Sequence, residues 1–121
     1  MKTILLLAAI AQVESGGRDD ATGDLNTRWP AIGRLQIRQP YLTDANQQLA
    51  KEGKRTYSLA EMRDYHKAQL VFWAYMRRYH VDGNNDEAVA RTHNGGPKGP
   101  QKKATLAYWL RVQRATKEAG Q

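Results

Sequence analysis

The sequence predicts a mainly α-helical single domain of about five helices, with a small β-hairpin or irregular insertion near residues 18–37. Apolar residues recur at spacings of three and four in several segments, which is the period of one helix face. A chain of 121 residues with 40% hydrophobic residues can bury one core but has no room for two domains. Because no repeat, linker or low-complexity tract divides it, we expect residues 1–121 to form one domain.

Residues 1–13 admit two interpretations. Lys2, the apolar stretch 3–10 and the small residues Ala9 and Ala11 are typical of a secretory signal with a cleavage site. The same stretch is also typical of a core helix. It is short for a signal and far too short to span a bilayer, which takes about 20 residues, and Glu14 follows it without a spacer. We therefore favour a helix of the mature domain over a cleavable signal peptide.

Pro40 and the Ser58 capping pattern mark the starts of two predicted helices, and glycines mark the ends of three. The predicted helices cover about residues 3–14, 40–53, 58–79, 86–95 and 101–119. The segment between the first two is polar and rich in turn residues, closing on an apolar stretch, and this pattern favours a loop or small hairpin.

The third helix carries the clearest signals. Ser58 and Glu61 form a capping-box pattern, which predicts that the helix begins there and continues to about Tyr79. Its expected apolar face consists of Leu59, Met62, His66, Leu70, Trp73 and Met76.

Composition narrows the classes of function. The absence of cysteine excludes disulfides, iron–sulfur clusters and thiol catalysis. The three histidines, His66, His80 and His93, are too scattered for a zinc motif, so we expect no metal and no cofactor. The net charge of +7 predicts a polyanionic partner: nucleic acid, an anionic membrane or the bacterial cell wall.

Glu14 is the first candidate for catalysis. It ends an apolar helix beside Ile10 and Val13, and desolvation by such neighbours raises the pKa of a carboxyl group. A neutral carboxylic acid can protonate a leaving oxygen, which is the general-acid step of glycosidic bond cleavage. The alternative is an ordinary solvated glutamate in the last turn of a helix.

Three acids follow shortly after: Asp19, Asp20 and Asp24. Many glycosidases need a second carboxylate as nucleophile or as activator of water. Asp24 lies in a turn-rich segment that can fold back over Glu14. Local turn bonding is the alternative explanation for all three.

Residues 92–99 (THNGGPKG) form the third candidate segment. No Gly-Lys-Ser/Thr ending follows, so the segment is not a phosphate-binding loop. Asn94 and the adjoining backbone offer donors and acceptors that can orient a sugar. Alternatively, the glycines only end a helix and His93 only packs.

Three segments in one order resemble the invertebrate-type, or destabilase, lysozymes. Residues 13–16 (VESG), 33–44 (GRLQIRQPYLTD) and 90–99 (ARTHNGGPKG) match the family patterns V-E-S-G, G-x-F-Q-I-K-x-x-Y-W-x-D and A-R-x-H-N-G-G-P-x-G. Thr105 with Tyr108-Trp109 matches its T-x-x-Y-W pattern. Goose-type lysozymes and soluble lytic transglycosylases share these features more loosely.

The resemblance implies a lysozyme-like fold and a bacteriolytic muramidase that cleaves the β-1,4 bond between N-acetylmuramic acid and N-acetylglucosamine. It places the catalytic acid at Glu14 and the second carboxylate at Asp24, with Asp20 as the fallback. The positions it associates with substrate binding are Gln36, Tyr41, His93, Asn94 and Gly95.

Two departures from the family pattern matter. Animal members are rich in cysteine, so this cysteine-free chain resembles a bacterial or phage relative. Leu42 stands where the family has Trp. We expect a monomer that acts on peptidoglycan glycan strands at the bacterial cell wall, whether in the periplasm, outside the cell or in phage lysis.

Other functions remain open at this point. A lytic transglycosylase would use Glu14 alone and release 1,6-anhydro products. A basic helical module that binds nucleic acid is suggested by Arg77-Arg78 and Lys102-Lys103, but no reading motif accompanies them, so no nucleic-acid partner is expected.

Overall fold

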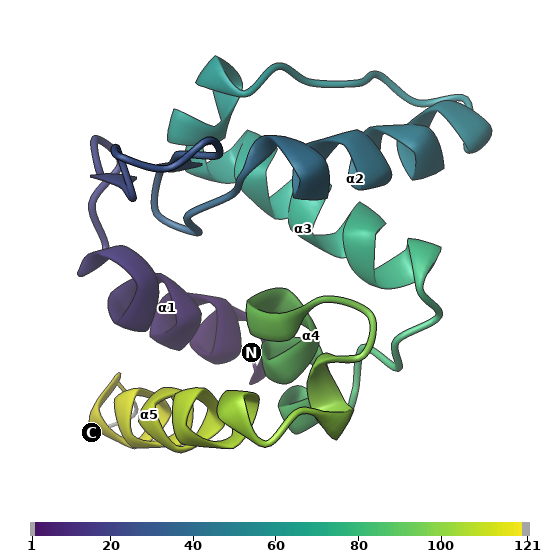
Figure 1. Cartoon of the computed structure of the whole chain (residues 1–121). Coiled ribbons are helices and arrows are strands. Elements are labelled where there is room, and N and C mark those ends of the chain that lie inside the picture. The colour runs from purple at the N-terminus through teal and green to yellow at the C-terminus, as the bar shows by residue number, and fades with distance from the viewer. Residues whose placement is uncertain (1, 120–121) are drawn as a thin grey trace.

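The computed structural model describes residues 2–119, which form a helical domain with one small β-hairpin (Figure 1). Its elements in chain order are α1 (Lys2–Ser15), β1 (Thr22–Gly23), β2 (Ala31–Ile32), α2 (Gln39–Lys51), the 3₁₀ helix η1 (Ala60–Arg63), α3 (Tyr65–Arg78), α4 (Asp86–Gly95), the 3₁₀ helix η2 (Gly99–Gln101) and α5 (Ala104–Ala119). The predicted fold class, mainly helical with an insertion near residues 18–37, is confirmed.

The helices pack in two groups. α1 lies along α5, which also packs against α4, while α2 packs against α3 (Figure 1). The apolar run of α1 belongs to the core: Leu6 and Leu7 are 2% exposed and Ile10 is fully buried. The predicted first helix is therefore confirmed, and its burial explains the run of apolar residues. Within residues 2–119, no helix combines the length and hydropathy needed to cross a bilayer.

The hairpin is small and is held by backbone contacts. β1 and β2 pair antiparallel, with Thr22 opposite Ile32. Gly33 has a φ of +81°, and a Cβ there would lie 2.1 Å from the carbonyl oxygen of Met62. Only glycine allows this approach. The hairpin is thereby seated on η1, which places the following residues at the cleft described below.

The prediction for the third helix is wrong at its start. The Ser58–Glu61 capping box does form, with the Ser58 amide donating to Glu61 Oε1 at 3.0 Å, but it opens only η1. Asp64 is extended and its side chain accepts from the amide of Lys67 at 3.1 Å, so it caps a separate helix, α3. Two capping side chains six residues apart, Ser58 and Asp64, thus start two helices. Each side chain accepts a hydrogen bond from a backbone amide at the start of its own helix, and this favours a new helix over continuation of the first.

This break also changes the buried face. His66 and Leu70, expected to face the core, are exposed. Met62 and Met76 are buried as predicted, and Val71 and Phe72 take the places expected for His66 and Leu70 in the core. A helix that begins at Tyr65 presents a different stripe to the core from one that begins at Leu59.

Candidate active site

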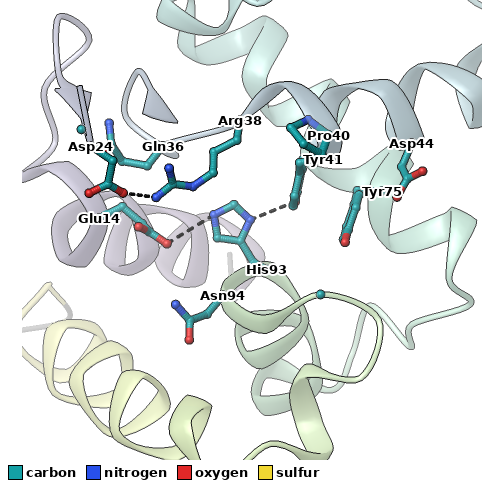
Figure 2. A pocket seen from close by; sticks show the side chains of 12 residues that line it. Glu14, Asp24, Gln36, Arg38, Pro40, Tyr41, Asp44, Tyr75, His93 and Asn94 are labelled. Carbon is teal, nitrogen blue, oxygen red and sulfur yellow. Dashed lines mark hydrogen bonds and ion pairs between the residues drawn. The ribbon is translucent and has the colours of Figure 1, made fainter. Parts of the chain in front are cut away.

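A cleft of about 530 Å³ runs between the hairpin and α2 on one side and α1 and α4 on the other (Figure 2). Residues from five segments of the chain line it: Glu14, Gly23, Asp24, Gln36, Arg38, Pro40, Tyr41, Asp44, Tyr75, His93, Asn94 and Gly96. The cleft therefore brings together six of the residues singled out in the sequence. Asp20 and Gly95 are not among the residues that line it.

Glu14 extends from the last turn of α1, and its side chain is 20% exposed. The Tyr108 hydroxyl on α5 donates to Glu14 Oε2 at 2.9 Å, and His93 Nε2 lies 3.5 Å from the same oxygen. Figure 2 shows the carboxyl group directed at the His93 ring across the cleft. The carboxyl group is thus held by partners on two other helices while remaining open to the cleft.

His93 is engaged on both sides of its ring. Nε2 lies 2.9 Å from the carbonyl oxygen of Leu35, which can only accept, so this nitrogen carries the proton. Nδ1 then accepts from the Tyr41 hydroxyl at 2.9 Å. Burial lowers the pKa of His93, although Glu14 and the Leu35 carbonyl oppose the shift, so the ring is neutral near pH 7. With both nitrogens occupied inside the protein, the geometry favours a positioning role over contact with a sugar.

Tyr41 and Tyr75 form a flat aromatic wall. Their rings stack with centroids 3.7 Å apart and an interplanar angle of 8°. Burial raises the pKa of Tyr75 to about 12 and that of Tyr41 well above its ordinary value, so both hydroxyls stay protonated. At this end of the cleft, the Tyr79 hydroxyl donates to Asp44 Oδ2 at 2.5 Å.

Asp24 lies on the hairpin, with a φ of +54° and a side chain that is 53% exposed. The Arg38 guanidinium forms an ion pair with it (Figure 2). Asp19 instead pairs with Arg34 at 2.6 Å. Of the three acids downstream of Glu14, Asp24 is the one that lines the cleft.

Gln36 braces the hairpin. Its side-chain amide donates to the carbonyl oxygens of Gly33 at 3.0 Å and of Ala21 at 3.4 Å. A Cβ on Gly23 would lie 2.2 Å from Gln36 Oε1, so glycine at position 23 makes room for this side chain. A substrate contact by Gln36 stays a prediction. The side-chain NH2 group is already used in the two hydrogen bonds above, so Oε1 is the atom that could make this contact.

The two glycines at the end of α4, Gly95 in its last turn and Gly96 just after it, have different surroundings. Asn94 is exposed and lines the cleft beside Gly96. Gly95 faces α5: its carbonyl accepts from Lys102 Nζ at 2.7 Å, and a Cβ there would lie 2.5 Å from Thr105 Cγ2. The predicted sugar contact of Gly95 remains a prediction, and this geometry gives the glycine a packing role.

A model of the Destabilase family matches residues 5–115, nearly the whole domain. The chain belongs to this family, the invertebrate-type lysozymes.

The similarity to invertebrate-type lysozymes extends over most of each relative. The invertebrate-type lysozyme of Ruditapes philippinarum is 32% identical over 111 residues, which are 89% of this chain and 77% of that protein. The lysozyme of Magallana gigas is 35% identical over 109 residues, covering 88% and 74%. The crystal structure of inhibitor-bound lysozyme from Meretrix lusoria superposes with a TM-score of 0.75 at 28% identity, covering 91% of this chain and 87% of that one. The lysozyme-like fold is confirmed.

Several residues of this invertebrate-type lysozyme cleft were not predicted as site residues. Arg38, Asp44 and Tyr75 line it, and Tyr108 supports it from behind. Asp44 and Tyr108 both fall on positions of the family patterns, so those patterns could have been used to predict them as site residues. Arg38 follows the Gln-Ile step, where the family has lysine. Among the described residues, no group of three or more histidines and carboxylates is arranged to hold a metal ion.

Proposed function

We propose that this protein is a muramidase that hydrolyses the β-1,4 bond between N-acetylmuramic acid and N-acetylglucosamine in bacterial peptidoglycan. The observation that carries the proposal is that Glu14 and Asp24 line one open cleft in a chain of the invertebrate-type lysozyme family. Two carboxyl groups across such a cleft are the equipment of most glycoside hydrolases.

In this mechanism Glu14 is the general acid. It protonates the bridging oxygen as the bond to the anomeric carbon breaks, and positive charge builds on the sugar ring. Asp24 is the second carboxylate, and the Arg38 guanidinium holds it at the edge of the cleft. Asn94, exposed at the cleft, is available to orient the sugar.

The separation of the two carboxyl groups in the substrate complex decides the stereochemistry. A separation of about 5–5.5 Å makes Asp24 the nucleophile and retains the anomeric configuration. A separation of about 6.5–9.5 Å leaves room for water and inverts it.

The charge of the chain supports the choice of substrate. A net charge of +7 attracts the enzyme to the carboxylates and phosphates of bacterial walls, and salt weakens that attraction. We propose that the protein acts on the wall as a monomer.

Glu14→Gln tests the proposal. Glutamine keeps the shape of the side chain but has no acidic proton, so we expect a loss of lysis of at least about a hundredfold. Clearing of a cell-wall suspension measures activity, and thermal denaturation checks that the variant is folded. Lysis by the variant at the rate of the unmutated protein would refute the proposal.

A second candidate activity, lytic transglycosylation, is favoured by one observation: the Asp24 carboxylate is already engaged by Arg38. Without a second carboxylate, Glu14 would act first as acid and then as base, and the muramic 6-hydroxyl would close a ring. Mass spectrometry of the released fragments distinguishes the activities, because hydrolysis leaves reducing ends and transglycosylation leaves 1,6-anhydro ends.

A further inference from the structure

The two oxygens of the Glu14 carboxyl group have different surroundings. Tyr108 donates a hydrogen bond to Oε2 at 2.9 Å. The Nε2–H of His93 lies 3.5 Å from the same oxygen, while its short hydrogen bond goes to Leu35. Among residues 4–118, no hydrogen bond reaches Oε1. The Tyr108 hydroxyl and the His93 ring nitrogen therefore both lie near Oε2, and neither is hydrogen-bonded to Oε1.

This asymmetry decides where a proton sits on Glu14. A protonated carboxyl group has one carbonyl oxygen, which accepts hydrogen bonds well, and one hydroxyl oxygen, which donates. The oxygen that accepts from Tyr108 is favoured as the carbonyl. The hydroxyl is then formed by Oε1, which is free of the protein's own donors.

Tyr108 suits this task because it is a permanent donor. Its side chain is 3% exposed between α5 and the core. Burial first, and the nearby Glu14 carboxyl group second, raise the pKa of its hydroxyl far above the ordinary value. The hydroxyl therefore keeps its proton over the whole range in which the enzyme can work.

We propose that Tyr108 is a positioning residue which, with His93 beside the same oxygen, directs the catalytic proton of Glu14 to Oε1. The proposal rests on the role of Glu14 proposed above. In the reaction the Oε1–H bond breaks, an O–H bond forms at the bridging oxygen, and the electron pair of the broken glycosidic bond goes to that oxygen. Glu14 becomes a carboxylate, and the Tyr108 hydrogen bond strengthens because its acceptor is now charged.

Tyr108→Phe tests this role because it keeps the buried ring and removes only the hydroxyl. With soluble peptidoglycan glycan fragments we expect kcat to fall about ten- to hundredfold, the effect of losing a hydrogen bond to a charged group, with KM unchanged. A buried residue that does not line the cleft has no substrate contact to lose, which is why KM is spared.

Two further readouts separate positioning from a merely structural role. The alkaline limb of the pH–activity profile moves to higher pH in Tyr108→Phe, because the ionised carboxylate has lost a donor. The titratable groups near Glu14 that stay in place are His93 from α4, Tyr41 from α2 and the Asp24–Arg38 pair that lines the same cleft. Arg111 of α5 lies over the ring at position 108 and also stays in place. In addition, with an aryl glycoside of the same oligosaccharide, whose leaving group departs without a proton, the loss of kcat shrinks to less than about threefold.

Matched variants complete the experiment. Tyr65→Phe removes a half-buried hydroxyl remote from the cleft, and we expect unchanged kinetics. Val112→Ala opens a small cavity in the core one turn further along α5; it lowers the melting temperature and leaves the pH profile unchanged. An unshifted pH profile in Tyr108→Phe, or an equal loss with both substrates, would overturn the inference. If Glu14→Gln is inactive in the same assays, the proposed function survives that result; if Glu14→Gln is active, the proposed function itself fails.

Discussion

Glu14 and Asp24 line the same cleft, but Glu14 extends from a core helix whereas Asp24 extends from an exposed hairpin. Glu14 is held by Tyr108 and lies beside the buried His93 ring, groups on two other helices. Asp24 is held by an ion pair with Arg38 in which both side chains are 41–53% exposed.

The difference shows that one cleft can hold one carboxyl group firmly and the other loosely. The Tyr108 hydrogen bond to Glu14 is partly buried, so breaking it costs more than breaking an exposed contact. Exposed ion pairs contribute only about 0–1 kcal/mol, so the hairpin carboxylate can adjust to a bound sugar at little cost.

The largest effect concerns activity on the hairpin side. Asp24→Asn removes the second carboxylate, and for a hydrolase we expect lysis to fall at least about a hundredfold while the melting temperature hardly changes. Asp19→Asn is the matched control: it breaks the Asp19–Arg34 pair, which is equally exposed but outside the cleft, and should lyse walls normally. Full activity of Asp24→Asn together with 1,6-anhydro products would assign the chemistry to Glu14 alone.

The next effect concerns how the hairpin is seated. Gly33→Ala places a Cβ against the Met62 carbonyl at a positive φ, and we expect the free energy of unfolding to fall by about 2–4 kcal/mol. In Gly53→Ala the φ is also positive, at +71°, but no atom lies within 4 Å, so only the backbone strain of about 1–2 kcal/mol remains. Urea denaturation of both variants isolates the contact. Equal losses would mean that the seat on η1 contributes nothing.

A smaller effect concerns the buried side of the cleft and its dependence on pH. The folded state lowers the pKa of His93 below its ordinary value of 6.5, so below that pH the unfolded chain binds a proton that the folded protein excludes. Stability therefore falls from pH 7 to pH 5, by at most about 1.4 kcal/mol per pH unit for one group. Urea denaturation at pH 7, 6 and 5 measures it.

His93→Gln should flatten this dependence, although the variant is less stable at pH 7 because Tyr41 and Leu35 lose their partner. His66→Gln changes an exposed histidine and should keep the slope of the unmutated protein. A common slope in all three proteins would show that His93 does not carry the effect.

The smallest effect calibrates what exposed ion pairs contribute. The pKa of Glu52 is lowered to about 2, first by its hydrogen bond from Arg77 and then by that from Gln48. This stabilisation is present above pH 4.5 and disappears as the pH falls to about 2. Glu52→Gln should lower the melting temperature slightly at pH 7 and not at pH 2. A large loss at pH 7 would mean that pairs such as Asp24–Arg38 are stiffer than argued.

What could be predicted from the sequence was local. The apolar period and glycine ends located α1, α2, α4 and α5, and turn residues located the hairpin. Asp64 shows the limit of such signals: it divided a segment that looked like one helix, because two capping patterns overlap there and periodicity alone does not rank them.

The partners of the candidate acid could not be predicted in the same way. Tyr108 lies 94 residues from Glu14 in the chain, and the Leu35 carbonyl lies 58 residues from His93. Their proximity depends on how α1, α4 and α5 pack against one another. This packing cannot be predicted from the residues of any one short segment. The family resemblance included Tyr108 in a matched pattern, but it did not show which atom accepts the hydrogen bond from the Tyr108 hydroxyl.

The His93 ring has a mechanical consequence. One imidazole on α4 bonds to Tyr41 of α2 and to the Leu35 carbonyl that precedes it, and also touches Glu14 of α1. The two sides of the cleft, α4 on one and α2 with the segment before it on the other, are thus joined by hydrogen bonds through this ring. They cannot move apart without breaking those bonds. The contacts of this one ring therefore fix the width of the groove beside Glu14.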